Sequence, residues 1–191
     1  MGRQRSIDRD KVLDMAEEIV ANQGAAGLTI DSVAKAMGIS KGGVQYCFGS
    51  KDALIDAMFE RWGKAYDTVF DAIAGENPSA TTSVRAHMQA TRSSDQASSA
   101  KAAGLMATLI QTPEHLNSTR EWYRSRIAGL DLTTEEGRRA RLVFLATEGA
   151  FMLRFFGLMD IGQQEWDAMF ADMQALVLAQ SQTAVADPAS K

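Results

Sequence analysis

The chain of 191 residues contains a single cysteine, Cys47, and only three prolines. One thiol cannot form a disulfide within the chain, and it cannot build a zinc site from paired cysteines. So few prolines leave long stretches free to be helical, because proline interrupts the helical hydrogen-bond ladder. No apolar run reaches the roughly 18 residues that a membrane-spanning helix needs. The N-terminus is basic but lacks the apolar core of a secretion signal, so we expect a soluble protein in the reducing cytoplasm, without a membrane partner.

Basic residues are too few to make the chain positive. Twenty Lys and Arg stand against 24 Asp and Glu, which gives a net charge of −4. This balance argues against a nucleic-acid coat protein or a polybasic membrane binder. The charge is unevenly distributed, since residues 1–51 carry seven basic and six acidic side chains, whereas residues 52–191 carry 13 and 18. The acidic excess therefore belongs to the C-terminal part of the chain.

Apolar residues make up 46% of the chain, enough to bury a core, and their spacing is helical. We see no alternating strand pattern, so we predict an all-α fold of about nine helices. A Ser/Ala-rich stretch, residues 93–103, is either a loop or the start of a helix. The clearest helices are predicted at residues 9–22, 29–37, 41–47, 51–74, 113–129, 134–156 and 163–180.

The most informative pattern is IDSVAKAMGISKGGVQYCFG, residues 30–49. Ala34 must be small because a second short helix crosses close to it, and Gly38 supplies the backbone angles of a tight turn. Ile39 and Val44 fill the core that the two helices share. This spacing is typical of a helix-turn-helix.

The capped helix before this motif, the motif itself and the FGSKDAL segment after it together resemble the TetR family of bacterial repressors. The resemblance covers residues 9–62. It implies a three-helix, helix-turn-helix DNA-binding domain in residues 1–49. It also implies a helical ligand-binding and dimerisation domain in residues 50–180, followed by a tail, residues 181–191, that we expect to be disordered.

The resemblance implies roles in binding double-stranded operator DNA. Thr29 is expected to cap the second helix and to offer a hydroxyl to a phosphate, and Lys51 to meet another phosphate. Gln45 and Tyr46 stand where family members contact bases and backbone, and a glutamine can bond an adenine edge bidentately. We further expect a flexible N-terminal arm to reach the DNA. The expected DNA-binding residues are Thr29, Ser40, Lys41, Gly42, Gly43, Gln45, Tyr46, Lys51, Arg3 and Arg5.

The C-terminal helices are rich in Met and Phe, and Glu148 lies on a helix face among them. A carboxylate among aromatic rings is costly unless it has a partner. Glu148 could neutralise a cationic ligand that the rings attract by cation–π interaction. Alternatively, it could pair with a core arginine or lie at an interface. The candidate ligand-binding residues are Met88, Met106, Trp122, Tyr123, Phe144, Glu148, Phe151, Met152 and Phe155.

The last two long helices also carry apolar faces suited to helix-on-helix association. The resemblance implies a homodimer through these helices, with two recognition helices in successive major grooves. The two faces comprise Leu142, Leu145, Gly149 and Leu153 on one helix, and Trp166, Phe170, Met173 and Val177 on the other.

Motifs for catalysis are absent from the sequence: there is no nucleophile–base pattern, Gly-rich phosphate loop or metal-spaced His/Asp/Glu set. We therefore predict no enzyme, no cofactor and no metal site. The predicted function is that of a repressor released from its operator by a small hydrophobic ligand, which is either neutral or cationic. The alternatives are a helical interaction module that uses the helix-turn-helix only for packing, or an enzyme without a recognisable motif.

Overall fold

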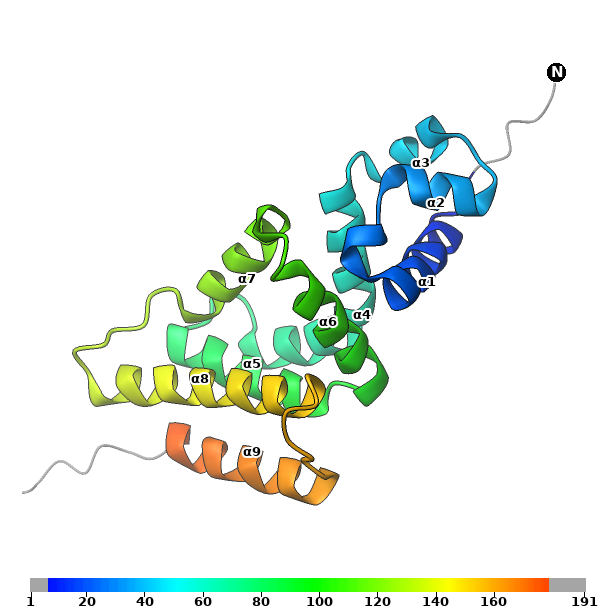
Figure 1. The fold of residues 1–191 in the computed structure, drawn as a ribbon. Helices are drawn as coiled ribbons and strands as arrows, with labels where there is room; N and C mark the ends of the chain where they lie inside the picture. Colours follow the sequence, from blue (N-terminus) through cyan, green and yellow to red (C-terminus); the bar gives the residue numbers. More distant parts are fainter. Residues whose placement is uncertain (1–6, 179–191) are drawn as a thin grey trace, which may run out of the picture.

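The computed structural model describes residues 7–178. Within that range the chain forms nine α-helices and one 3-10 helix, without strands, which confirms the all-α prediction (Figure 1). Arg3, Arg5 and the tail at 181–191 lie outside the described residues. The elements are α1 Arg9–Gly27, α2 Ile30–Met37, α3 Lys41–Phe48, α4 Lys51–Ala74, α5 Ala80–Ser93, α6 Gln96–Leu109, η1 Pro113–His115, α7 Asn117–Ile127, α8 Glu135–Phe155 and α9 Gln163–Leu178.

Most of the helices begin at a residue whose side-chain oxygen accepts a hydrogen bond from a free amide of the first turn. The N-terminal amides have no partner within the helix, so the sequence marks these boundaries clearly. The capping residues are Asp8, Thr29, Ser40, Ser50, Ser79, Asp95 and Thr134.

Two boundaries differ from the predicted ones, and one segment that the sequence left open is decided. Helix α1 continues to Gly27, although Gly24, where we expected it to stop, has non-helical angles of φ 69° and ψ 179°. The Ser/Ala-rich stretch is mostly helix α6, which begins after the cap Asp95. Pro113 starts only the short η1, so that α7 begins four residues later, at Asn117.

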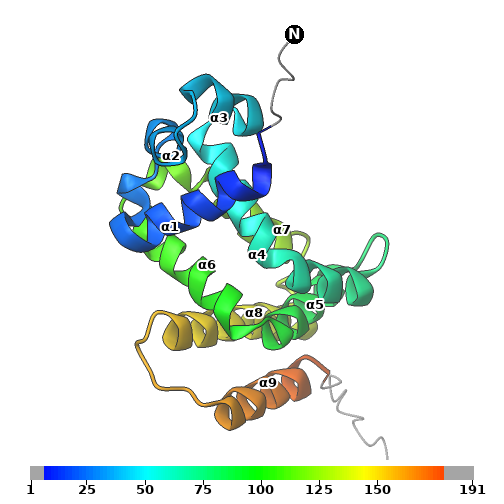
Figure 2. The same ribbon diagram turned by 90° about the vertical axis from the view of Figure 1, so that its right-hand side faces the viewer.

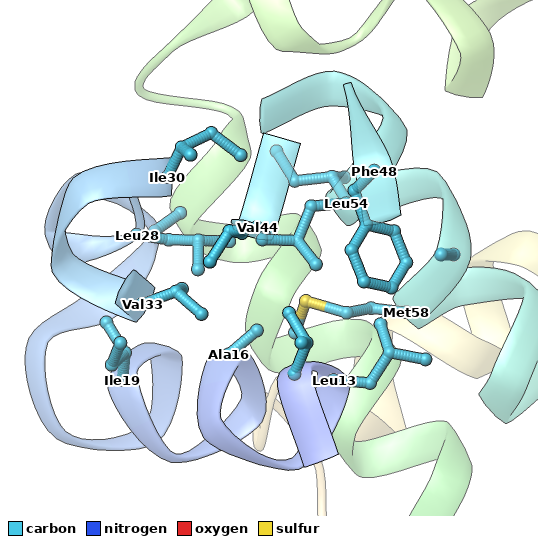
Figure 3. Close-up of a cluster of buried hydrophobic side chains, with 14 of the residues drawn as sticks. Leu13, Ala16, Ile19, Leu28, Ile30, Val33, Val44, Phe48, Leu54 and Met58 are labelled. Carbon is cyan, nitrogen blue, oxygen red and sulfur yellow. The ribbon is translucent and has the colours of Figure 1, made fainter. Parts of the chain in front are cut away.

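The N-terminal helices enclose one hydrophobic core. Figure 3 shows Leu54 of α4 between Val44 and Phe48 of α3, so α4 closes the core that α1–α3 begin. Two residues of α6, Leu105 and Leu109, are fully buried in the same cluster. The helix-turn-helix is therefore packed against two helices that extend into the rest of the molecule.

A second core lies among α5, α8 and α9. In both views α8 and α9 run side by side at the end of the molecule away from α1–α3 (Figures 1 and 2). Trp166, Phe170 and Met173 of α9 are buried in this core within the chain, whereas we had expected their face to associate with a partner. The physical reason is that α5 and α8 already supply an apolar surface for this side of α9.

Candidate DNA-binding surface and ligand cavity

Helix α3 exposes the side chains that we expected to meet DNA. Tyr46 is 91% exposed, and Lys41 and Gln45 are exposed as well. Val44 and Phe48, on the opposite face, are buried and hold the helix on its core. An aromatic ring so open to water buries little apolar surface within the chain and is therefore accessible to a partner.

The turn between α2 and α3 has the geometry of the motif. Gly38 adopts φ 65° and ψ 31°, in the left-handed region that glycine tolerates best. Thr29 and Ser40 cap the two helices, each accepting from the amide three residues on, at 2.9 Å and 3.1 Å respectively. Both lie exposed at helix N-termini, where amides and helix dipoles favour phosphate.

Lys51 has an intramolecular partner. Its Nζ donates to the carbonyl oxygen of Ala25 at 3.0 Å, which ties the start of α4 to the end of α1. Arg9, in the first turn of α1, donates to the carbonyl oxygen of Cys47 at 2.8 Å and lies over the Phe48 ring. These bonds to main-chain carbonyls hold α3 and α4 against α1.

A cavity of about 510 Å³ lies between α4, α5, α6, α7 and α8. Its walls are mostly apolar, and this volume falls within the usual range for sites that bind small molecules. Six of the nine ligand-binding candidates line it: Met106, Trp122, Tyr123, Glu148, Phe151 and Met152.

The other three candidates lie in the core beside the cavity. Met88 and Phe144 are buried in the second core, and Phe155 packs between Phe151 and Trp166. Their rings and thioether support the wall from behind.

A chain of polar groups crosses the cavity wall. His87 of α5 is 1% exposed, and its Nδ1 is hydrogen-bonded to the Tyr66 hydroxyl at 2.9 Å. Its Nε2 lies 2.8 Å from Oε1 of Glu148, but out of line for an N–H···O bond. The Tyr123 phenol interacts with the same carboxylate, which raises the pKa of the phenol. Glu148 thus has partners, though not the core arginine that the sequence suggested.

Both tyrosines are kept as neutral phenols by this environment. Burial raises the pKa of the Tyr66 phenol above its ordinary value, and the guanidinium of Arg126 only partly opposes this. Burial likewise raises the pKa of Tyr123, and the adjacent Glu148 carboxylate raises it further. A buried hydroxyl with a raised pKa remains a hydrogen-bond donor across the neutral pH range.

Among the described residues of the cavity wall, Arg126 supplies the one guanidinium, and four residues supply carboxylates. It lies 3.9 Å from the ring centroid of Phe70 and 4.6 Å from that of Trp122, and its buried Nε has no hydrogen-bond partner in the described structure. Burial raises the pKa of the wall residues Asp56 and Asp67. The wall carboxylates belong to Asp56, Glu60, Asp67 and Glu148.

Several wall residues were not among the candidates from the sequence, and the most important for the polar contacts are Tyr66, His87 and Arg126. The available signal was helical spacing, because Tyr66 and Phe70 are one turn apart, as are Trp122 and Arg126. His87 stands in the apolar stripe of α5, at a position that a hydrophobic residue usually occupies. Spacing within one helix does not reveal which side chains of other helices it will meet.

The cavity and the N-terminal core share structural elements. Phe59 and Trp62 of α4 line the cavity and also pack against the N-terminal core. The indole Nε1 of Trp62 donates to Glu17 of α1 at 3.0 Å, and Lys101 of α6 pairs with the same carboxylate at 2.8 Å. Glu17 therefore connects α1 with two helices that form the cavity.

Across residues 7–178, no three His, Cys, Asp or Glu side chains are grouped so that they could hold a metal ion. In the same range, every helix is too short or too polar to cross a membrane.

Comparison with known proteins agrees with this architecture. The family model described as bacterial regulatory proteins, tetR family, matches residues 12–58. The model described as tetracyclin repressor-like, C-terminal domain, matches residues 81–178, about half of the chain. An uncharacterized HTH-type transcriptional regulator in the dhlA 5′ region of Xanthobacter autotrophicus is 36% identical over 61 residues, spanning 32% of this chain and 30% of that protein.

Solved structures with a similar fold cover nearly the whole chain. The multidrug binding protein EbrR, complexed with imidazole, is 19% identical and covers 91% of each chain with a TM-score of 0.59. NalD, the secondary repressor of the MexAB-OprM multidrug efflux pump in Pseudomonas aeruginosa, is 18% identical, covering 87% of this chain and 93% of its own, with a TM-score of 0.57. From its family matches and its fold, this chain belongs to the TetR family of bacterial transcriptional regulators, which are DNA-binding proteins and not enzymes.

Proposed function

We propose that the protein is a cytoplasmic, homodimeric repressor that a small hydrophobic ligand releases from its operator. The observation that carries this proposal is that α4 and α6 each contribute side chains to both the cavity wall and the helix-turn-helix core. A ligand that changes the packing of these helices would change the position of α3. Such coupling requires that the ligand bind the DNA-free arrangement more tightly than the DNA-bound one.

Operator recognition is assigned to the exposed face of α3 and to the N-termini of α2 and α3. Tyr46 and Gln45 are proposed to contact bases and backbone, while the caps Thr29 and Ser40 face phosphates. Lys51 would reach a phosphate only by leaving the Ala25 carbonyl, unless it acts by holding α4 in place. The full proposed set also includes Lys41, Gly42 and Gly43, and the arm residues Arg3 and Arg5.

Dimerisation is assigned to the outer face of α8 with α9. Leu142 and Leu145 are 55% and 57% exposed, and a Cβ on Gly149, one turn further along α8, would meet open space. Exposed leucines beside a small residue allow two helices to pack closely. Exposed apolar side chains continue in the turn after α8 and on α9, at Leu158, Met159, Leu176 and Leu178.

Gel shifts with the DNA upstream of the protein's own gene, or with selected sequences, test operator binding. Tyr46→Ala should weaken specific binding without changing thermal stability, because the ring is exposed. Deleting residues 1–6 should reduce the salt dependence of binding if Arg3 and Arg5 meet phosphates. Absence of specific, salt-sensitive binding to any sequence would overturn the proposal.

Release by a ligand is tested on the same complex. The names of the structural neighbours EbrR and NalD concern multidrug binding and a multidrug efflux pump, which supports screening hydrophobic cations and neutral compounds. A compound that shifts the thermal unfolding temperature should also release the DNA. Met106→Trp, which would fill part of the cavity, should abolish both effects, whereas Ile110→Trp, on an exposed position of the same segment, should not.

A further inference from the structure

The contact between His87 and Glu148 places a titratable base against the carboxylate in the cavity. The imidazole is enclosed by the rings of Tyr66, Trp122 and Phe144, with centroids 5.9, 5.8 and 5.1 Å away. Its Nε2 lies 2.8 Å from the Glu148 oxygen yet makes no well-directed hydrogen bond in the described structure. The contact is therefore chiefly electrostatic, and its strength depends on whether the imidazole carries a proton.

The Tyr66 hydroxyl accommodates both protonation states. A phenol both donates and accepts, so it can donate to a neutral Nδ1 or accept from a protonated one at the same 2.9 Å separation. The imidazole can therefore gain or lose a proton without breaking this hydrogen bond. Histidine is the side chain whose ordinary titration falls near neutral pH.

The remaining charges around His87 leave Glu148 as its direct counter-charge. Helix α7 supplies Tyr123, which interacts with Glu148, and Arg126, which lies over Phe70 and Trp122 and interacts with Asp67 of α4. Helix α6 contributes only uncharged residues to the wall. The titratable or charged wall residues of the other helices are Tyr66, Asp56, Glu60 and Asp67 from α4, His87 from α5 and Glu148 from α8.

We propose that the cavity binds a lipophilic monocation in exchange for a proton from His87. The ligand charge would lie against Glu148 and the faces of Tyr123 and Phe151, where a protonated imidazole would repel it. The imidazolium loses its Nδ1 proton to the solvent as the ligand enters, and Tyr66 then donates to Nδ1, so the cavity gains one positive charge and loses one. This inference rests on the proposed function of the cavity as the effector site.

The exchange predicts how affinity depends on pH. While His87 is protonated in the free protein, each bound cation displaces about one proton, and the affinity rises about tenfold per pH unit. Once His87 is neutral, the affinity no longer changes with pH. A neutral ligand of similar size displaces no proton, because Glu148 keeps its original counter-charge.

Isothermal titration calorimetry with the full chain tests the exchange. Tetraphenylphosphonium is the permanent cation and triphenylphosphine oxide the neutral control, each titrated in two buffers of different ionisation enthalpy over a range of pH. The buffer dependence of the heat counts the protons released, and it requires no variant. We expect release with the cation, decreasing as the pH rises, and none with the oxide.

Two variants test whether His87 is the source of the released proton and whether Glu148 is the counter-charge of the bound cation. His87→Gln keeps an acceptor for the Tyr66 hydroxyl but cannot titrate, so it should bind the cation without proton release and without pH dependence. Glu148→Gln should bind the cation at least tenfold more weakly than the native chain while binding the oxide equally well. Circular dichroism confirms that each variant is folded.

Three results would overturn the inference: no binding of tetraphenylphosphonium at any pH, binding without proton release, or the same release from the His87→Gln variant. None of these would by itself refute the proposed repressor, because operator binding and its release by other compounds are measured separately by gel shift. Conversely, loss of operator binding would refute the repressor and leave the calorimetric result intact.

Discussion

Gly38 illustrates how one residue sets the geometry of the DNA-binding motif. Its angles of φ 65° and ψ 31° direct the chain from α2 into α3, and an added Cβ would meet no neighbouring atom. The restriction at this position is therefore backbone strain and not crowding. Gly42 is also open to solvent but lies inside α3 with helical geometry.

The matched pair Gly38→Ala and Gly42→Ala separates these two situations. Gly38→Ala should lower the free energy of unfolding by about 1–2 kcal/mol, the cost of a left-handed conformation for an L-residue. Gly42→Ala should raise it by about 0.5–1 kcal/mol, because alanine is the better helix former. Urea unfolding measures both, and equal effects of the same sign would contradict this assignment.

The buried phenols make stability fall at alkaline pH. The folded-state pKa values of Tyr66 and Tyr123 are raised, mainly by burial, so the unfolded chain loses these protons at a lower pH than the folded one. Their contribution is fully present below the ordinary tyrosine pKa of about 10 and is lost as the pH rises above it.

The double variant Tyr66→Phe and Tyr123→Phe tests this linkage through Tm values at about pH 8 and about pH 11. It should lose less stability between these two values than the native chain does. Tyr46→Phe, at an exposed position, serves as the control and should behave like the native chain. An unchanged alkaline loss in the double variant would show that other groups cause it.

At the scale of elements, α6 carries two adjacent stripes of side chains with different roles. Leu105 and Leu109 are buried in the N-terminal core, whereas Ala102 and Met106 line the cavity. Residues three or four apart share a helix face, so the two pairs form adjacent stripes on one side of the same short helix. Helix α6 therefore contacts both the core of the proposed DNA-binding domain and the proposed ligand cavity.

Leu109→Ala should remove packing from the helix-turn-helix core and lower the free energy of unfolding by about 2–5 kcal/mol. Ile110→Ala, at the adjacent and exposed position, should change it by about 0.5 kcal/mol or less. Chemical denaturation gives both values. Similar losses in the two variants would mean that the end of α6 is not part of that core.

At the scale of the whole molecule, the proposed DNA-binding and dimerisation surfaces lie at opposite ends. In Figures 1 and 2, α3 is at one end and the paired α8 and α9 are at the other, with α4 and α6 between them. A dimer formed through α8 and α9 would have two-fold symmetry and present two copies of α3 to the DNA. The distance between the two copies of α3, which must match the spacing of the two halves of the operator, then depends on how α4 and α6 hold each N-terminal core.

Leu145→Glu should disrupt this dimer, because it places a charge at the centre of the exposed apolar face of α8. Sedimentation equilibrium should give the monomer mass, with unchanged helical content, and operator affinity should fall. Ile110→Glu, at the exposed position that directly follows α6, should remain dimeric. A native chain that sediments as a monomer at all concentrations, or a Leu145→Glu variant that remains dimeric, would refute the proposed interface.

The local structure of the protein is largely encoded in short sequence patterns. Several signals involve only residues that are close together in the chain, so their effects can be predicted without knowledge of the fold. They are the caps Thr29, Ser40 and Ser50, the turn at Gly38, and the apolar spacing of α1 and α4. These patterns predicted the helix-turn-helix, and the resemblance drawn from them predicted the family that the comparisons establish.

Tertiary packing decided the rest. Tyr66, His87 and Glu148 come from three helices, and only the angles at which those helices cross bring the three side chains together. The same packing turned the apolar face of α9 inward and left Leu145 of α8 outside. Periodicity shows that a helix has an apolar face, but which surface covers that face depends on the competing burial options of the whole chain.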